Sequence, residues 1–474
     1  MVEPVRDFTP AKALAIDTPR ILENLIVSPQ VLPDLTPDKI SKNDIRSTLK
    51  ASTLDGVFAT IFTCATSGVL LTNFLLQLGA TSTEIGLLSA MPMVVNCLQP
   101  VGSGLADRTI SRRWYNLWMF SASRLFWLIL VMAIGWASWR GFEEHQLLQW
   151  TLYVVLAASM LGALSTANWF SWIAVLVPRR LRGRYFGFRN SATSLTSFLG
   201  VPLLGLGVSA WGGGTIQGYG VVLFLGVVAG MIGLGCQFFM ADVNPQIHGK
   251  EEEAEQGGGE VSVSSSSSQF FFASSFHSFI PSPFKDFNFL ILLLYIGFWA
   301  FAVNLSAPFF NLYLLRDLTL DVTWVTLYTS LSAGANLLLL MFWGKLADKV
   351  GNRVLLIFVG IVVALTPLLW LGIGNNSVSL WLWLPVLHSL MGGTSGAIEL
   401  CNNNIQMEIA PKRGPSSYFA IAAAVAGITG ALGTTFGGFL AEFPGFSLGG
   451  LFALSAIARL VAIIPLVFVC DRRS

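Results

Sequence analysis

Twelve apolar stretches, each long enough to cross a bilayer as a helix, constrain this chain more than any other feature. They lie at about residues 54–78, 84–104, 114–139, 147–176, 191–210, 218–240, 287–313, 324–343, 353–374, 378–409, 416–440 and 447–470. A spanning helix needs about 20 mostly apolar residues. The stretches are too long for buried strands and lack the alternation of a membrane barrel. We therefore predict an all-α polytopic membrane protein with twelve transmembrane helices.

The composition indicates that lipid is the natural solvent of this chain. Only 11% of the 474 residues are charged and 54% are apolar, whereas a soluble domain carries about 25% charged residues. The five cysteines all lie in apolar runs and form no Cys-x-x-Cys pair, so we expect neither disulfides nor a metal cluster. No Walker, His-Glu-x-x-His or Gly-x-Ser-x-Gly motif is present, which argues against ATP-driven or hydrolytic chemistry. We expect no cofactor, no metal, no nucleic-acid partner and no enzymatic activity.

The basic residues are distributed unequally between the two sides of the predicted bundle. The loops after stretches two, four, eight and ten, together with the C-terminal tail, carry fifteen Lys and Arg residues, and the opposite loops carry two. Because Lys and Arg concentrate in cytoplasmic loops, this bias predicts that both termini are cytoplasmic. We expect a monomeric, multi-pass protein of the bacterial inner membrane.

Two polar segments divide the chain into four parts. Residues 1–50 mix basic and acidic side chains with six prolines and are predicted to be a mostly irregular cytoplasmic extension. Residues 241–286 begin with an acidic, Gly-rich and Ser-rich run, which is typical of a flexible linker. The predicted six-helix bundles are therefore residues 51–240 and 287–474.

Three landmarks recur in the same order in the two halves. "NFLLQLGATSTEIGLLSA" parallels "NLYLLRDLTLDVTWVTLY", "GLADR" parallels "KLADK", and "VPRRLRGRYFG" parallels "APKRGPSSYFA", at offsets of 238, 241 and 233 residues. Such a repeat indicates duplicated halves. With the signature "GKLADKVGNR" after the eighth stretch, the chain resembles the major facilitator superfamily over roughly residues 50–472. That resemblance implies two pseudo-symmetric six-helix halves with a central binding site.

The resemblance also implies a cytoplasmic gating motif after stretches two and eight. Its residues in this chain are Gly104, Asp107, Arg108 and Arg112 in the first copy, and Gly344, Asp348, Lys349, Gly351 and Arg353 in the second. We expect each copy to form a short turn between helices. The first copy departs from the pattern at Ser103 and Ile110, and Val175 stands where many relatives have an acid, whereas the second half keeps Glu408.

In the resembled family, the aspartates of this motif latch the cytoplasmic ends together when the carrier faces outward. By that analogy Asp107 is expected near Ser416, and Asp348 near Ser191. Negative charge at a helix N-terminus is favourable, by about 0.3–1 kcal/mol when exposed. Because the first copy is degraded, we expect Asp348 to form the stronger latch. The alternative role for the basic residues of the motif is anchoring the loops at the membrane surface.

Stretch ten is the most polar and supplies the first candidate site residues. Glu399 lies twelve residues before Pro411, which places it about 18 Å from the helix end and so near the membrane midplane. Burial there raises the pKa of a carboxyl group, which suits proton exchange. Asn402 and Asn403 share roughly the same helix face. The alternative is a structural carboxyl group paired with a neighbouring helix.

The resemblance implies that stretches one, four, seven and ten line the cavity, which brings in weaker candidates. Asn168 is predicted near the midplane, and Trp169 and Trp172 are predicted to form an aromatic wall or else to face lipid. Asn304 and Asn96 are further candidates.

Three charged residues in the apolar stretches are given structural roles. We expect Arg124 and Arg459 to make ion pairs or polar core contacts, and the alternative is that they bind a ligand. Asp55 follows Ser52 and Thr53 at the predicted start of the first helix, so we interpret it as a first-turn capping residue.

The predicted function is secondary transport of a small organic solute by alternating access, with efflux coupled to protons as one form of it. The alternatives are a non-transporting membrane sensor or a membrane-embedded enzyme on the same scaffold, because fold alone does not fix function.

Overall fold

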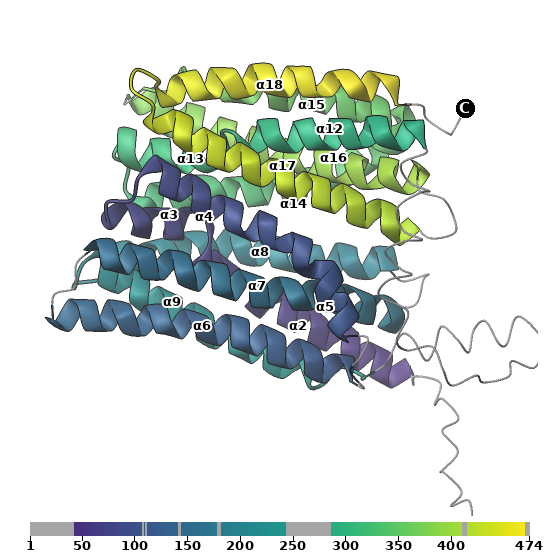
Figure 1. The fold of residues 1–474 in the computed structure, drawn as a ribbon, viewed down its shortest axis with the longest axis horizontal. Coiled ribbons are helices and arrows are strands. Elements are labelled where there is room, and N and C mark those ends of the chain that lie inside the picture. Colours follow the sequence, from purple (N-terminus) through teal and green to yellow (C-terminus); the bar gives the residue numbers. More distant parts are fainter. Residues whose placement is uncertain are drawn as a thin grey trace, which may run out of the picture.

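The computed structural model describes residues 42–106, 109, 111–140, 144–177, 182–242, 286–374, 376–409 and 415–469. Helices account for nearly all of these residues and lie roughly side by side in two bundles (Figure 1). Most of the predicted N-terminal extension and almost all of the predicted linker lie outside the described residues. The prediction of an all-α membrane protein in two halves is confirmed.

The helices of the N-terminal half are α2 (Lys42–Thr66), α3 (Gly68–Gln77), α4 (Ser82–Val95), the 3₁₀ turn η1 (Asn96–Leu98), α5 (Gln99–Ala106), α6 (Arg112–Arg140), α7 (Glu144–Leu176), α8 (Arg182–Ser209) and α9 (Thr215–Gln237). Those of the C-terminal half are α12 (Phe287–Asn304), α13 (Ala307–Leu312), the π-helical turn η4 (Tyr313–Asp317), α14 (Val322–Val350), α15 (Asn352–Trp370), the π-helical turn η5 (Ser379–Trp383), α16 (Leu384–Ile409), α17 (Pro415–Glu442) and α18 (Leu448–Phe468).

Ten helical segments in the described part of the chain are long and apolar enough to cross a membrane. The shorter apolar segment Ser82–Leu98, continued by α5, and the polar helix α16 stand where the sequence predicts the second and tenth spans. The arrangement is consistent with twelve spans.

The first helix of each half is broken at a matched position. Ser67 interrupts the first span between α2 and α3, and Gly68 follows it with φ of +65°, a conformation that favours glycine. Leu305 and Ser306 interrupt the seventh span between α12 and α13. Each of them lies 238 residues after its counterpart in the first span, Ser67 or Gly68. Broken helices of this kind are where membrane carriers build their binding sites.

Two helix boundaries differ from those predicted by hydropathy. The first helix begins at Lys42 rather than near residue 54, so residues 42–50 are helical and not irregular. Helix α14 continues to Val350, which makes most of the signature decapeptide helical. Gly351 alone, with φ of +88°, separates α14 from α15, so the expected turn is a single residue.

We call the end of the bundle that holds Arg112, Lys349 and Arg353 the basic end, and the opposite end the clamped end. At the clamped end, α4 of the first half meets α17 of the second. The backbone N–H and the hydroxyl group of Thr83 donate hydrogen bonds to the Glu442 carboxylate at 2.9 and 2.7 Å.

Three more hydrogen bonds join the halves at the clamped end. Ser209, the last residue of α8, donates a hydrogen bond to Asp321 at 3.2 Å, and Thr323 donates one to Ser209 at 2.9 Å. Arg316 donates a hydrogen bond to the Ser82 hydroxyl at 2.9 Å. These contacts connect α8 to α14 and α4 to the end of the seventh span.

The apolar cores also differ between the two ends. One core contains residues of both halves near the clamped end, including Phe74 and Leu75 with Phe309 and Leu312. Near the basic end each half has its own core, one around Trp172 and the other around Phe289. Consistent with this, the two bundles diverge toward the basic end in Figure 1, on the side of the C-terminus.

Candidate functional site

A cavity with two compartments lies between the broken helices. The C-half compartment, of about 1090 Å³, is lined by α12, α15, α16, α17 and α18. The N-half compartment, of about 650 Å³, is lined mainly by the first half, together with Asn304, Pro308 and Asn311. Ala307, at the break of the seventh span, lines both compartments.

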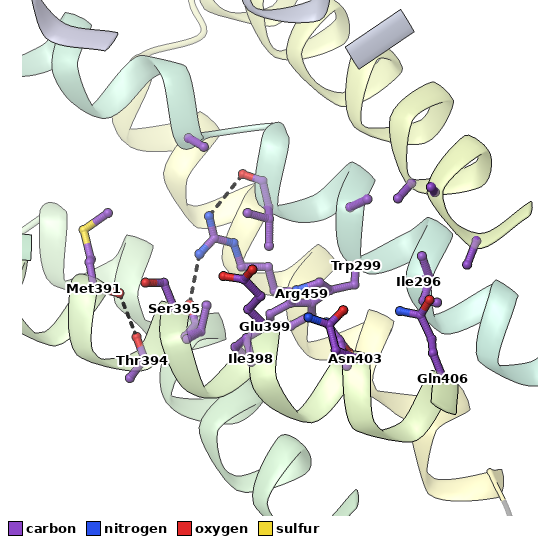
Figure 2. A pocket seen from close by; sticks show the side chains of 18 of the residues that line it. Ile296, Trp299, Met391, Thr394, Ser395, Ile398, Glu399, Asn403, Gln406 and Arg459 are labelled. Atoms are coloured by element: carbon purple, nitrogen blue, oxygen red, sulfur yellow. Dashed lines mark hydrogen bonds between the residues drawn. The ribbon is translucent and has the colours of Figure 1, made fainter. Parts of the chain in front are cut away.

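A polar stripe on α16 forms one wall of the C-half compartment. Ser395, Glu399 and Asn403 are four residues apart and therefore share one helix face, with Gln406 one turn further on. Figure 2 shows Glu399, Asn403 and Gln406 in a row along this helix. The Glu399 side chain is exposed, and in the described part of the chain it has no hydrogen-bond or ion-pair partner. The predicted burial of this carboxyl group is not found, because the side chain faces the open cavity.

The opposite wall is apolar. Ile296 and Trp299 of α12 and Phe419 of α17 line it. Trp299 is mostly buried and stacks against Tyr295, so its ring is held in place by the second half's core. Asn402 also lines this compartment, beside the buried Tyr295.

Arg459 of α18 lines the same compartment but is held by the protein. Its side chain is only 3% exposed and donates hydrogen bonds to the Val363 and Val303 carbonyls at 3.0 and 3.2 Å, and to the Ser306 hydroxyl at 2.8 Å. Residue 367 is a proline, so it has no N–H for the Val363 carbonyl four residues earlier. Arg459 replaces that donor, which confirms the expectation of polar core contacts.

The N-half compartment contains a buried charge cluster that sequence reasoning missed. Asp55 is 3% exposed and accepts a hydrogen bond from Gln237 of α9 at 3.2 Å. The guanidinium groups of Arg124 and Arg189 act electrostatically on this carboxylate. Arg124 donates a hydrogen bond to the Gly230 carbonyl and lies over the Phe62 ring.

The interpretation of Asp55 as a capping residue is wrong. Helix α2 begins thirteen residues earlier, at Lys42, so Asp55 lies in its interior. Residues 42–54 contain no glycine or proline, and that absence of helix breakers was the signal that hydropathy alone concealed.

Two of the fourth-span candidates do not line the cavity. Asn168 is fully buried and bonds the side chain of Arg112 and, at 3.1 Å, that of Asn116. Arg112 begins α6, so Asn168 lies toward the basic end rather than at the midplane. Trp172 is also fully buried and donates a hydrogen bond to the Ala241 carbonyl at 3.0 Å.

The remaining candidates line the N-half compartment. Trp169 lies under the Arg189 guanidinium at 4.6 Å, a cation–π contact. Asn304 lies at the end of α12, where its side chain donates a hydrogen bond to the Ala300 carbonyl at 2.8 Å. Asn96 accepts a hydrogen bond from Gln99 at 3.1 Å. All three are among the lining residues.

The gating motif is only partly visible. Asp107 and Arg108 lie outside the described residues, and Gly104 is on α5. Gly344, Asp348 and Lys349 lie on the last turns of α14, before Gly351.

The second copy of the motif does not form the expected latch in this conformation. In the described part of the chain, the exposed Asp348 has no hydrogen-bond or ion-pair partner, and Ser191 is exposed as well. Arg353 instead donates a hydrogen bond to the Val467 carbonyl within its own half. In this conformation the polar contacts between the halves lie at the clamped end.

In the described residues, no group of three or more His, Cys, Asp or Glu side chains is arranged to hold a metal ion.

The comparisons with known proteins agree with this architecture. The family model described as Major Facilitator Superfamily matches residues 56–313 and 289–474. A curated relative, the "Multi-drug resistance efflux pump PmrA homolog" of Lactococcus lactis subsp. lactis (strain IL1403), is 34% identical over 169 residues. That match covers 34% of this chain and 39% of the relative.

Solved structures of membrane carriers share the fold. The xylose transporter XylE from E. coli, in an inward open conformation, matches with a TM-score of 0.65 and 14% identity over 91% of this chain and 97% of that one. The nucleoside transporter NupG matches with a TM-score of 0.61 and 12% identity over 90% and 99%. A bacterial homologue of the iron transporter ferroportin, in an inward-facing state, matches at 0.63 and 14% over 90% and 99%. The family match over most of the chain makes this protein a member of the Major Facilitator Superfamily.

Proposed function

We propose that the protein moves a small organic solute across the bacterial inner membrane by alternating access, with the basic end in the cytoplasm. The observation that carries this proposal is the asymmetry of the cavity's ends. The halves share one core at the clamped end and have separate cores at the basic end. Rocking the halves about the cavity exchanges one closed end for the other.

Proton coupling is the finer part of the proposal. Glu399 faces the cavity without a partner in the described chain, and Asp55 is a buried carboxylate beside two arginines. Ionisable groups within spans are costly and mark substrate or proton paths. We assign the coupling role to Glu399, as the sequence suggested, and add Asp55 as a second proton-accepting candidate.

Outward transport is the favoured direction. The curated relative named as an efflux pump homolog supports export. The match to this chain covers 39% of that relative's length. The rival reading of the same scaffold is a sensor that binds a solute without moving it. An experiment that holds the clamped end closed distinguishes the transporter from the sensor. A transporter must open this end to move its solute, whereas a sensor need not.

The test is a disulfide across the clamped end. The Ser209 and Thr323 hydroxyl groups are 2.9 Å apart on α8 and α14, so cysteines at these positions join the halves. The pair is introduced in a background without the native cysteines and reconstituted into liposomes that contain a pH-sensitive dye. Labelled solutes of several classes are then supplied with an imposed proton gradient.

We expect oxidation of the Ser209→Cys/Thr323→Cys pair to abolish gradient-driven solute movement, and reductant to restore it. The two single-cysteine variants serve as controls and should be unaffected by oxidant. Transport that continues in the cross-linked protein would exclude alternating access. Solute binding without transport in the reduced protein would support the sensor.

A further inference from the structure

The cavity contains one charged side chain that has neither a hydrogen-bond nor an ion-pair partner in the described chain. Five charged residues line the two compartments in the described chain: Asp55, Arg124, Arg189, Glu399 and Arg459. Among these, only Glu399 has neither a hydrogen bond nor an ion pair. Its carboxylate is exposed to the cavity.

The positive charges of the cavity are held by other protein groups. Arg459 is 3% exposed, and its N–H groups are directed at two carbonyls and at the hydroxyl groups of Ser306 and Ser455. Arg124 is buried beside Asp55 and bonds the Gly230 carbonyl. These arginines therefore stabilise the fold and are poorly placed to bind an anionic solute.

Arg189 is also engaged, although it is only half-buried. It stacks on Trp169 and donates a hydrogen bond to the Ser52 carbonyl at 3.4 Å. It belongs with Asp55 to the N-half cluster, in which opposite charges face one another. Two arginines face one carboxylate in that cluster, and the C-half compartment contains one Glu and one Arg, so formal charge does not single out Glu399. Glu399 is singled out because, among the lining charges of the described chain, only its carboxylate has no protein partner.

The residues around Glu399 define which other groups a bound ligand would contact. Asn403 and Gln406 continue the polar stripe toward the basic end and offer carbonyl acceptors. Across the compartment, Trp299 and Phe419 present aromatic surface (Figure 2 labels Trp299 opposite the stripe). A site with one negative stripe and one aromatic wall suits a ligand with a cationic head and a flat apolar body.

We propose that the transported solute is an amphipathic organic cation whose charged nitrogen or phosphonium lies at Glu399 and whose apolar body lies against Trp299 and Phe419. This inference rests on the proposed transport function and names its substrate class. The compartment of about 1090 Å³ accommodates a drug-sized molecule. A sugar is a poorer fit, because most of the wall offers no partner for its hydroxyl groups.

The test uses two ions of nearly the same shape and opposite charge. Tetraphenylphosphonium and tetraphenylborate are each titrated against the purified full chain in detergent, with equilibrium dialysis as the measurement. We expect the protein to bind the phosphonium saturably. Glu399→Gln, which keeps the size of the side chain, should weaken that binding about fivefold, since it removes the charge partner of the bound cation at an exposed position.

The matched control is Glu408→Gln on the same helix. Glu408 accepts a hydrogen bond from Asn352 at 2.8 Å and does not line the cavity, so its loss should leave phosphonium affinity within twofold of the parent. Thermal unfolding of both variants verifies that they are folded. Tighter binding of the borate than of the phosphonium, or unchanged phosphonium binding in Glu399→Gln, would overturn the proposal.

Failure of the substrate class is distinguishable from failure of the transport function. A protein that binds the phosphonium through Glu399 but is indifferent to the Ser209–Thr323 cross-link supports this inference and contradicts alternating access. A protein that is inhibited by the cross-link but carries only neutral or anionic solutes supports the function and contradicts the inference.

Discussion

Arg459 shows how a charge in an apolar helix is explained by a proline elsewhere. The Val363 carbonyl has no helical donor because residue 367 is Pro, and the Arg459 guanidinium supplies one at 3.0 Å. The sequence marks both residues as unusual in apolar spans. It does not show that they meet, because α15 and α18 come together only through the fold of the second half.

Removing the Arg459 side chain should therefore lower the free energy of unfolding, by an amount that depends on whether residue 367 is a proline. We expect Arg459→Met to lower the free energy of unfolding by about 1–3 kcal/mol, the cost of a buried acceptor without a donor. In a Pro367→Ala background the cost should be smaller, because the alanine N–H can reach the Val363 carbonyl. Denaturant unfolding of the four proteins measures this coupling.

Lys345→Met, at an exposed position of α14, is the control and should change stability by less than about 0.5 kcal/mol. An equal cost of Arg459→Met in both backgrounds would show that the proline is irrelevant.

The candidate site could be predicted only where sequence distance tracks depth. Glu399 was identified because a regular helix connects it to a recognisable end at Pro411. Asp55 was missed because hydropathy places the start of α2 too far along the chain. Asn168 was placed at the wrong depth because its side chain bonds Arg112 near the basic end. The position of a single polar residue along a span is hard to predict from sequence, because the residues that it bonds lie on other helices.

At the scale of the elements, glycines set how closely the two halves approach. A Cβ atom placed on Gly86 of α4 would lie 2.5 Å from the Thr434 carbonyl oxygen of α17, and one on Gly438 would lie 2.8 Å from the Ser82 carbonyl oxygen. The glycine-rich run "GITGALGTTFGGF" in the eleventh span is typical of close helix packing, but it does not show that the partner is α4 of the other half. The clamped end closes because neither glycine has a side chain.

Gly86→Val should open the clamped end rather than unfold the protein. Overpacking costs about 1–3 kcal/mol, so we expect the ratio of open to closed molecules to rise about tenfold. Spin labels at the exposed residues Trp211 and Phe443, one in each half, report the opening as a longer distance in electron–electron resonance.

Gly200→Val on α8 is the matched control, because nothing lies within 4 Å of a Cβ placed there. It should leave the distance distribution unchanged. A Gly86→Val protein with the parent's distribution would mean that α4 and α17 do not limit closure.

At the scale of the whole molecule, the sequence predicted the parts better than the conformation. The repeat offsets identified two equivalent halves, and the helix breaks lie at a matched position in both. Which end is closed does not follow from the repeat, because the two conformations of a carrier differ by only a few kcal/mol. That balance depends on a small number of contacts between the halves, such as those of Ser209 and Asp321.

Acid should weaken the closed state of the clamped end through Asp321. Partial burial raises the pKa of Asp321, but hydrogen bonds from Thr323 and Ser209 outweigh it, so the pKa lies below its usual value of 3.8. When one conformation lowers the pKa of a carboxyl group, the ionised carboxylate stabilises that conformation. The stabilisation is fully present above about pH 4 and is lost as the pH falls through the lowered pKa.

We therefore expect the same spin-label pair to report more open molecules as the pH falls below about 4. Ser209→Ala removes the contact between the halves but leaves Asp321 as the cap of α14, so it should reduce this pH dependence. Closure that strengthens in acid would contradict the assignment.

The single residue between α14 and α15 has a mechanical consequence. Because Gly351 alone separates the two helices, the corner has no slack, and α15 must follow any swing of α14. Arg353 fixes the start of α15 to the end of α18, so the swing is passed on to a third helix. We therefore expect the charged decapeptide to act as a stiff corner between α14 and α15, and a longer loop there to let these helices move independently.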